Sequence, residues 1–465
     1  MKTMAGFASR VVQLGAFWLV VGSTLDAGVY QSQWLNRTER YWAGPEFWTN
    51  PLQDWRVRSG RLECWRSGGD RNAYLLTREL RSGRGSLTTT VTVGRLDSDV
   101  SSDGTGWVGF KLGSQGEFRD YRDSAVRGHG LNAGMRTNGQ LFIGNFTDSS
   151  EAVTQALVQV TLRLQVEPLG QRYRVSITAL DGNRQVLARH ARHDIHPDWL
   201  IGQTALVCSA REPVPSDLTA GRFVASDPAL HSDPAVPSRA GADAAGGNVR
   251  FWFRDWRLEG SKVAVYPDRA WGPVLWTQYT LSNRVLKLTT QMAPVGNDCR
   301  TVQLQTRRAD SAGWETIREA LIDPLARTTT FHVSDWDDSL DTDFRVVYPM
   351  AGSDGTPTAY DYQGTIRQDP KDKPDIVVAA FTGNNDFGFP HADVVRAVSW
   401  HRPDLLVFTG DQIYERVGDY GIQRTGDVEI ATLDYLRKWY MMGWEYRELL
   451  RDIPTVFLPD DHDVY

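Results

Sequence analysis

Three short polar clusters near the C-terminal end combine acidic, amide, phenol and imidazole side chains at close spacing. They read TGNND over residues 382–386, GDQIYE over 410–415 and PDDHD over 459–463. Carboxylate and phenolate oxygens are ligands that hard cations such as Ca²⁺, Mn²⁺ and Fe³⁺ prefer. An imidazole beside them can move a proton near neutral pH. Together the clusters predict a metal site.

Each cluster follows a short apolar run that reads as a buried strand. The runs are DIVVAAF, DLLVFTGD and PTVFL, and they are separated by the helical pattern ADVVRAVSWH and by a longer helical pattern that begins at Asp427. Alternating strands and helices predict a parallel sheet, whose strands all deliver their carboxyl ends to one edge. The three clusters are therefore expected to meet at that edge.

The motifs GDQIYE and DDHD resemble the opening motifs of the calcineurin-like metallophosphoesterase superfamily, most closely its alkaline phosphatase D branch. The resemblance covers residues 374–465 and, loosely, the β-sandwich before them. It implies a secreted, metal-dependent phosphoesterase that hydrolyses phosphate monoesters or diesters. It also implies two or more bound metal ions, with calcium, iron or manganese expected.

The resemblance assigns roles to individual residues. Asp411 would bridge two metals, Tyr414 would supply a phenolate ligand, Asp461 would take the place of an Asn ligand, and His462 would protonate the leaving oxygen. Asp411 and His462 are thus the expected catalytic residues.

The first cluster departs from the branch, which usually places a Cys or Asp ligand at this strand end. Here the chain offers Asn384 and Asp386 as expected metal ligands and Asn385 as an expected contact for substrate. His391 is a further candidate for binding substrate, and the alternative is an ordinary histidine on a surface loop.

The superfamily draws further ligands from later strands, and the sequence stops at Tyr465. The resemblance therefore implies the N-terminal fragment of a longer enzyme, with little activity in this chain alone.

The region before residue 263 has the period-two pattern of β-strands. The segment VQVTLRLQV alternates strictly, and DWRVRSGRLEC and FWFRDWRLEG resemble the paired terminal strands of concanavalin-like or laminin-G-like jelly rolls. We expect a jelly-roll-like sandwich over residues 28–262, with a mobile loop at about 212–248 that is rich in Pro, Ala, Gly and Ser.

A second all-β pattern over residues 263–367 has the strand spacing of a seven-stranded immunoglobulin-like or fibronectin-III-like sandwich. The predicted fold class is therefore multidomain: two all-β sandwiches, followed by the incomplete first part of an α/β metallophosphatase domain.

Most of the chain is predicted to form β-sandwiches, and this favours a second possible function. The protein would then be an extracellular carbohydrate-binding or adhesion protein with a vestigial metallophosphatase domain. A polysaccharide would then bind the N-terminal sandwich, and Trp42, Trp48, Trp55 and Trp107 are the tryptophans that could stack on sugar rings. The alternative is that these four side chains fill the core.

The composition and the N-terminal segment limit the possible binding partners and the cellular location of the protein. A net charge of −6 with scattered Lys and Arg argues against a nucleic-acid surface and a polybasic membrane signal. The apolar run VVQLGAFWLVVG is too short to span a bilayer, so residues 1–27 read as a signal peptide, with an uncleaved anchor or a buried first element as alternatives. A secreted, periplasmic or cell-surface protein is expected.

The chain has three cysteines, Cys64, Cys208 and Cys299, without metal-ligand spacing. Three buried thiols, or one disulfide and a remaining thiol, fit this number equally well.

Overall fold

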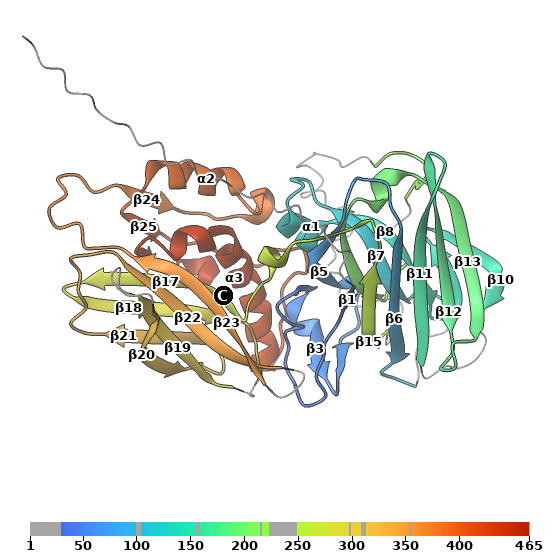
Figure 1. The fold of residues 1–465 in the computed structure, drawn as a ribbon, viewed down its shortest axis with the longest axis horizontal. Coiled ribbons are helices and arrows are strands. Elements are labelled where there is room, and N and C mark those ends of the chain that lie inside the picture. The colour runs from blue at the N-terminus through green and yellow to red at the C-terminus, as the bar shows by residue number, and fades with distance from the viewer. Residues whose placement is uncertain are drawn as a thin grey trace, which may run out of the picture.

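A computed structural model describes residues 29–98, 104–153, 159–213, 216–222, 249–296, 299–307, 313–352 and 356–464. The predicted signal peptide (1–27) and most of the predicted mobile loop (212–248) lie outside the described residues. The described chain forms two β-sandwiches and a small α/β unit, which Figure 1 shows with the first sandwich on the right.

The first sandwich has two eight-stranded sheets. One contains β1 (Tyr30–Gln31), β3 (Trp55–Arg58), β4 (Arg61–Cys64), β6 (Leu87–Arg95), β11 (Gln159–Leu169), β12 (Arg172–Leu180), β13 (Val186–Ile195) and β15 (Phe251–Glu259). The other contains β2 (Phe47–Asn50), β5 (Arg71–Leu80), β7 (Trp107–Gln115), β8 (His129–Arg136), β9 (Gln140–Ile143), β10 (Phe146–Ala152), β14 (Gly202–Ser209) and β16 (Val263–Val265). All pairings are antiparallel, and the apolar inner faces of the two sheets enclose one core.

The alternating sequence patterns do form strands with one buried face. Along β11 the side chains of Val160, Leu162, Leu164 and Val166 are buried. The two segments expected to pair at the ends of this sandwich also lie side by side, because Phe251 of β15 is the register partner of Cys64 in β4.

The four tryptophans considered as sugar platforms all lie in the protein interior. Trp42, Trp48, Trp55 and Trp107 expose 4%, 5%, 0% and 1% of their surface. No sugar ring can stack on a side chain buried to this degree, so the core interpretation of these four residues is correct.

The second sandwich has a three-stranded and a four-stranded sheet, all antiparallel. The first contains β17 (Val274–Ser282), β18 (Val285–Met292) and β21 (Thr328–Val333), and the second contains β20 (Glu315–Leu321), β19 (Thr301–Arg307), β22 (Thr342–Ala351) and β23 (Pro357–Ile366).

The α/β unit contains a three-stranded parallel sheet in the order β24 (Val378–Phe381), β25 (Leu405–Phe408), β26 (Thr455–Phe457). Helix α2 (Ala392–His401) connects the first two strands, and α3 (Val428–Leu450) connects the last two. The carboxylate of Asp427 caps α3 by accepting a hydrogen bond from the Ile430 amide (3.2 Å). All three strands deliver their carboxyl ends to the same edge.

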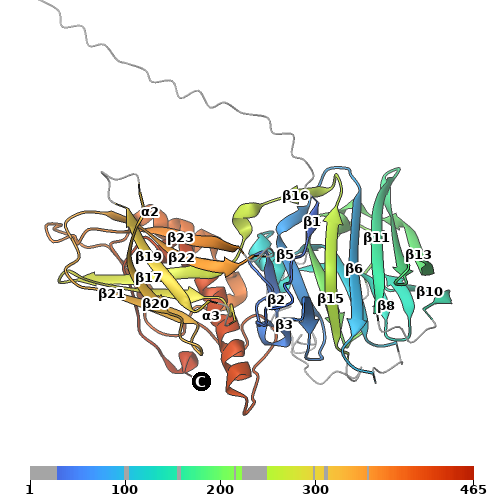
Figure 2. The same ribbon diagram turned by 60° about the horizontal axis from the view of Figure 1, so that its bottom comes forward.

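Helix α3 packs against both sandwiches, as Figure 2 shows from a second direction. Its Trp444 ring lies 4.8 Å from the ring of Trp48 in the first sandwich and 4.8 Å from that of Trp271 beside the second. This apolar contact connects the parts and fixes where α3 and the strand-end loops lie.

The remaining short helices are α1 (Tyr121–Arg127) and the 3₁₀ turns η1 (Leu52–Asp54), η2 (Pro197–Leu200), η4 (Pro267–Arg269), η5 (Asp386–Gly388) and η6 (Asp461–Asp463). Within the described residues, none of the helices has the length and apolar character needed to cross a membrane.

Candidate metal-binding site

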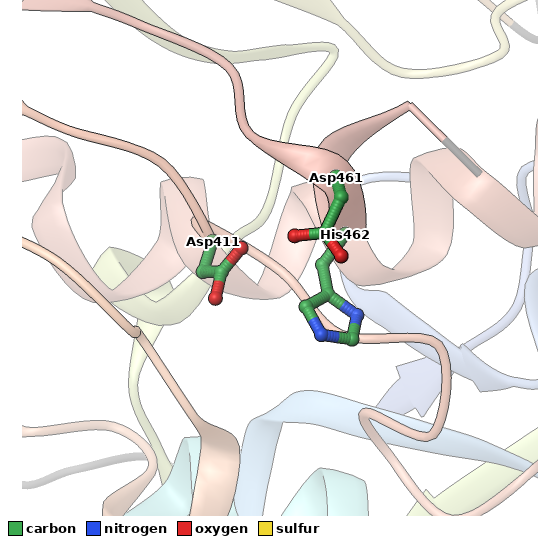
Figure 3. Close-up of side chains that lie close together, drawn as sticks. All are labelled: Asp411, Asp461 and His462. Carbon is green, nitrogen blue, oxygen red and sulfur yellow. The ribbon is translucent and has the colours of Figure 1, made fainter.

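Asp411, Asp461 and His462 form a group that could hold a metal ion, and Figure 3 shows them converging from two loops. Each residue offers one ligand atom, and these atoms lie within 4.8 Å of one another. Asp411 follows β25, and the other two residues are in η6 after β26. The expected meeting of these two polar clusters at the sheet edge is therefore present.

The loop backbone that carries Asp411 is tightly constrained. Asp411 has a φ of 53°, and Gly410 before it has a φ of 103°. A Cβ atom on Gly410 would lie 2.5 Å from the Cβ of Asp460, so only glycine lets the two loops approach this closely. The close approach brings the carboxylates of Asp411 and Asp461 together.

Asp463 joins the two loops through its carboxylate. It is 7% exposed and accepts hydrogen bonds from the backbone amides of Asp411 (2.8 Å), Gln412 (2.9 Å) and Asp460 (3.0 Å). The sequence shows Asp463 only as one more acidic residue in PDDHD. In the structure it positions the possible ligands and points at the backbone rather than at a cation.

One carboxylate oxygen of Asp411 is satisfied and the other is not. Oδ2 accepts a hydrogen bond from the Tyr414 hydroxyl at 2.9 Å, whereas Oδ1 is buried without a hydrogen-bond partner. Burial, followed by the nearby Asp411 carboxylate, raises the pKa of Tyr414 and favours the protonated, donating phenol. A buried carboxylate oxygen without a partner is costly, and a cation would remove that cost, so the residues present fit a metal ion.

His462 is oriented by a carboxylate that the sequence motifs did not single out. Its Nδ1 lies 2.9 Å from Oε2 of Glu415, and this hydrogen bond is the largest cause of its raised pKa. The imidazole also packs against Tyr414, with 4.6 Å between ring centroids. A carboxylate on one ring nitrogen is the usual arrangement for a metal-binding histidine, and it leaves Nε2 to face a cation.

The residues of the first cluster serve other contacts. The Asn384 amide donates to Glu445 (2.9 Å) and its carbonyl accepts from Tyr446 (2.9 Å). The Asp386 carboxylate is ion-paired with Arg127 of α1 and accepts from the Gly418 amide at 2.7 Å. Among the described residues, Asp386 does not belong to the group of acidic and histidine side chains that could hold a metal ion.

The two residues expected to contact substrate also have local partners. The Asn385 side chain caps η5 by accepting from the Phe387 amide (3.2 Å). His391 lies at the start of α2 with its Nδ1 2.6 Å from Oε1 of Glu445. Burial lowers the pKa of His391, but the hydrogen bond and charge of Glu445 outweigh it and the net pKa is raised. Glu445 carried no sequence signal, because it lies within an ordinary helical pattern.

Comparisons with known proteins give no family for the chain. No protein-family model matches it, and no curated protein matches it. Solved structures that match include lectin II from Ulex europaeus (10% identity, TM-score 0.29). This match covers 50% of this chain and 98% of the lectin chain. The match to the basic winged bean lectin with Tn-antigen (10% identity, TM-score 0.30) covers 50% of this chain and 99% of the lectin chain. The match to the exoplasmic/lumenal domain of VIP36, in a Ca²⁺/Man3GlcNAc-bound form (9% identity, TM-score 0.24), covers 48% of this chain and 85% of the VIP36 chain.

These findings correct the phosphoesterase interpretation. No family model matches the chain, so none supports a metallophosphoesterase. The recognition of an alkaline phosphatase D relative and the hydrolase activity inferred from it are therefore wrong, whereas the extent of a separate domain over residues 374–465 stays a prediction. The physical reason is that acidic clusters on a small parallel sheet specify a place for a cation, and many chemistries can use such a place.

Proposed function

We propose that this protein is an extracellular carbohydrate-binding protein in which Asp411, Asp461 and His462 hold one divalent cation that takes part in binding the sugar. The observation that carries the proposal is the convergence of three ligand atoms within 4.8 Å, one of them in a residue with a buried, unpartnered oxygen. Calcium or manganese suits this mixture of carboxylate and imidazole donors.

Three protein ligands leave coordination positions for oxygen atoms from elsewhere. Calcium takes six to eight oxygen ligands and manganese accepts similar donors, so water or neighbouring hydroxyl groups of a ligand would complete the shell. Sugars present pairs of adjacent hydroxyls at a spacing that one cation can accept together. The partly exposed Tyr414 ring beside the cluster offers an apolar surface for sugar C–H groups.

The charge around the cluster favours a neutral ligand over a phosphate ester. Asp411, Asp460, Asp461, Asp463 and Glu415 all lie on the two loops that meet here. One divalent cation does not neutralise this many carboxylates, so a dianionic ligand would be repelled and an uncharged sugar would not.

The first sandwich offers a second surface where a polysaccharide could lie. Tyr41 and Trp65 are partly exposed, with 6.2 Å between their ring centroids. The guanidinium groups of Arg56 and Arg66 lie 5.0 Å and 5.7 Å from the Trp65 ring centroid. A partly exposed aromatic pair suits contact with a sugar ring, so Trp65 is the residue whose loss tests whether the sandwich contributes.

A glycan array tests the proposal. The protein is applied with Ca²⁺, with Mn²⁺ and with a chelator, and Asp461→Asn is compared with the wild type. The matched control is Asp393→Asn, which removes the same charge from an aspartate whose side chain is 92% exposed on α2. We expect cation-dependent binding that Asp461→Asn weakens at least about tenfold and Asp393→Asn leaves unchanged.

Each negative outcome of this experiment contradicts a different part of the proposal. Calorimetric cation binding without any glycan binding would refute the carbohydrate assignment. Glycan binding that survives the chelator and Asp461→Asn but is lost in Trp65→Ala would move the site to the sandwich. Absence of both activities would refute the whole proposal.

A further inference from the structure

Two of the three cysteines lie in the core of the first sandwich, one on each sheet. Cys64 ends β4 in one sheet, and Cys208 is near the end of β14 in the other. Both are 1% exposed and both belong to the core cluster enclosed between the sheets. They are far apart in the sequence and share one core only because the sheets stack.

Both cysteines are free thiols in the structure, and they lie at the same end of the core, because Cys208 contacts the Val249 carbonyl two residues before Phe251, the register partner of Cys64. Each also contacts a backbone carbonyl, Cys64 that of Arg66 (3.5 Å) and Cys208 that of Val249 (3.4 Å). Their backbones are held by regular ladders, because Cys64 pairs with Trp55 and Phe251, and Cys208 pairs with both neighbouring strands. Both backbones are therefore fixed, and the two side chains enter one core from opposite sheets.

We propose that Cys64 and Cys208 form a disulfide that joins the two sheets of the first sandwich. Sandwich domains can carry such an inter-sheet bridge beside a buried tryptophan. Trp55, the cross-strand partner of Cys64, is 0% exposed.

The bond forms by thiol–disulfide exchange with an external disulfide such as oxidised glutathione. One cysteine thiolate attacks the external disulfide and releases one glutathione thiol, and the second thiolate then attacks the mixed disulfide and releases the other. The protein loses two protons and two electrons, and the external disulfide is reduced to two thiols.

The reaction belongs to folding rather than to the finished fold. Burial excludes reagents from the closed sandwich and raises the pKa of Cys64, which disfavours the reactive thiolate. Cys299 lies outside this core, beside Thr301 in the second sandwich, and is partly exposed. It therefore remains a thiol.

The experiment is oxidative refolding of the full chain. The protein is unfolded and reduced, then refolded with oxidised and reduced glutathione or with reductant alone, and thiols are blocked with N-ethylmaleimide under denaturing conditions. We expect a mass about 2 Da lower before blocking, a single linked peptide pair containing Cys64 and Cys208, and a modified Cys299. The reduced form should unfold roughly 5–10 °C lower.

Variants define the pairing. Cys299→Ala should keep the linked peptide, and Cys208→Ala should abolish it and leave Cys64 free for modification. The inference is overturned if both Cys64 and Cys208 are modified by maleimide after oxidative refolding, or if either is found linked to Cys299. Both readings come from the wild-type protein, so the test does not depend on the folding of any variant.

Discussion

Replacing Asp463 is expected to release the two loops that carry the candidate metal ligands. Its carboxylate accepts three backbone hydrogen bonds, from Asp411, Gln412 and Asp460, at 2.8–3.0 Å. Hydrogen bonds to a charged group contribute about 1.5–3 kcal/mol each, and the lower end applies where water can reach the freed amides. Asp463→Ala should therefore lower the free energy of unfolding of the α/β unit by about 3–5 kcal/mol.

Asp463→Asn removes the negative charge but keeps the size and shape of the side chain, so it distinguishes the two effects. The amide can keep one acceptor oxygen toward Asp411 and Asp460, but its NH₂ group then faces the Gln412 amide, which loses its partner. We expect a loss of about 1–2 kcal/mol. Urea unfolding followed by hydrogen exchange of the α3 amides, together with calorimetric Mn²⁺ binding, measures both effects. An Asp463→Ala protein with wild-type unfolding and wild-type cation affinity would refute the reasoning.

Two further predictions concern helices α2 and α3. The raised pKa of His391 means that its contact with Glu445 stabilises the fold most below pH 6.5, the ordinary histidine value, and that this stabilisation declines as pH rises through the raised pKa. The difference in stability between wild type and His391→Gln should therefore shrink with rising pH, and a difference that grows would contradict this. A Cβ at Gly443 would lie 2.4 Å from the Trp276 ring, so Gly443→Ala should destabilise the protein by about 1–3 kcal/mol in thermal unfolding. Gly426→Ala, where no heavy atom lies within 4 Å of the added Cβ, is the control and should be close to neutral.

Local patterns predicted the elements well where a single face is buried. The alternation of Val160 to Val166 gives β11, and the apolar spacing of Leu433, Leu436, Tyr440 and Trp444 gives the buried face of α3. Such patterns depend only on neighbours along the chain. The packing of Trp444 between two sandwiches could not be predicted, because it joins residues hundreds of positions apart.

The candidate site could be predicted only in part for the same reason. Strand-end position brought Asp411, Asp461 and His462 into one prediction, and the structure places them together. The partner of Asp386 is Arg127, in a helix of the first sandwich, and the partner of Asn384 and His391 is Glu445 in α3. These contacts occupy the side chains of the first cluster, and nothing in its own sequence indicates them. Ligation by Asn384 and Asp386 stays a prediction.

Motif resemblance misled the assignment of activity. Short motifs such as GDQIYE and DDHD describe acidic loops, and acidic loops bind cations for structural, binding or catalytic purposes. The function therefore has to be argued from the charge and the open coordination positions of the cluster itself.

The most direct test of the account is the anomalous scattering of Mn²⁺ in crystals of this protein. We predict one peak between Asp411, Asp461 and His462, about 2.0–2.4 Å from a carboxylate oxygen of each aspartate and from Nε2 of the histidine. Soaking with a glycan selected on the array should place sugar hydroxyls on the same ion. A protein with no peak there at millimolar Mn²⁺, or with its ion bound by Asp386 and Asn384 instead, would contradict the account.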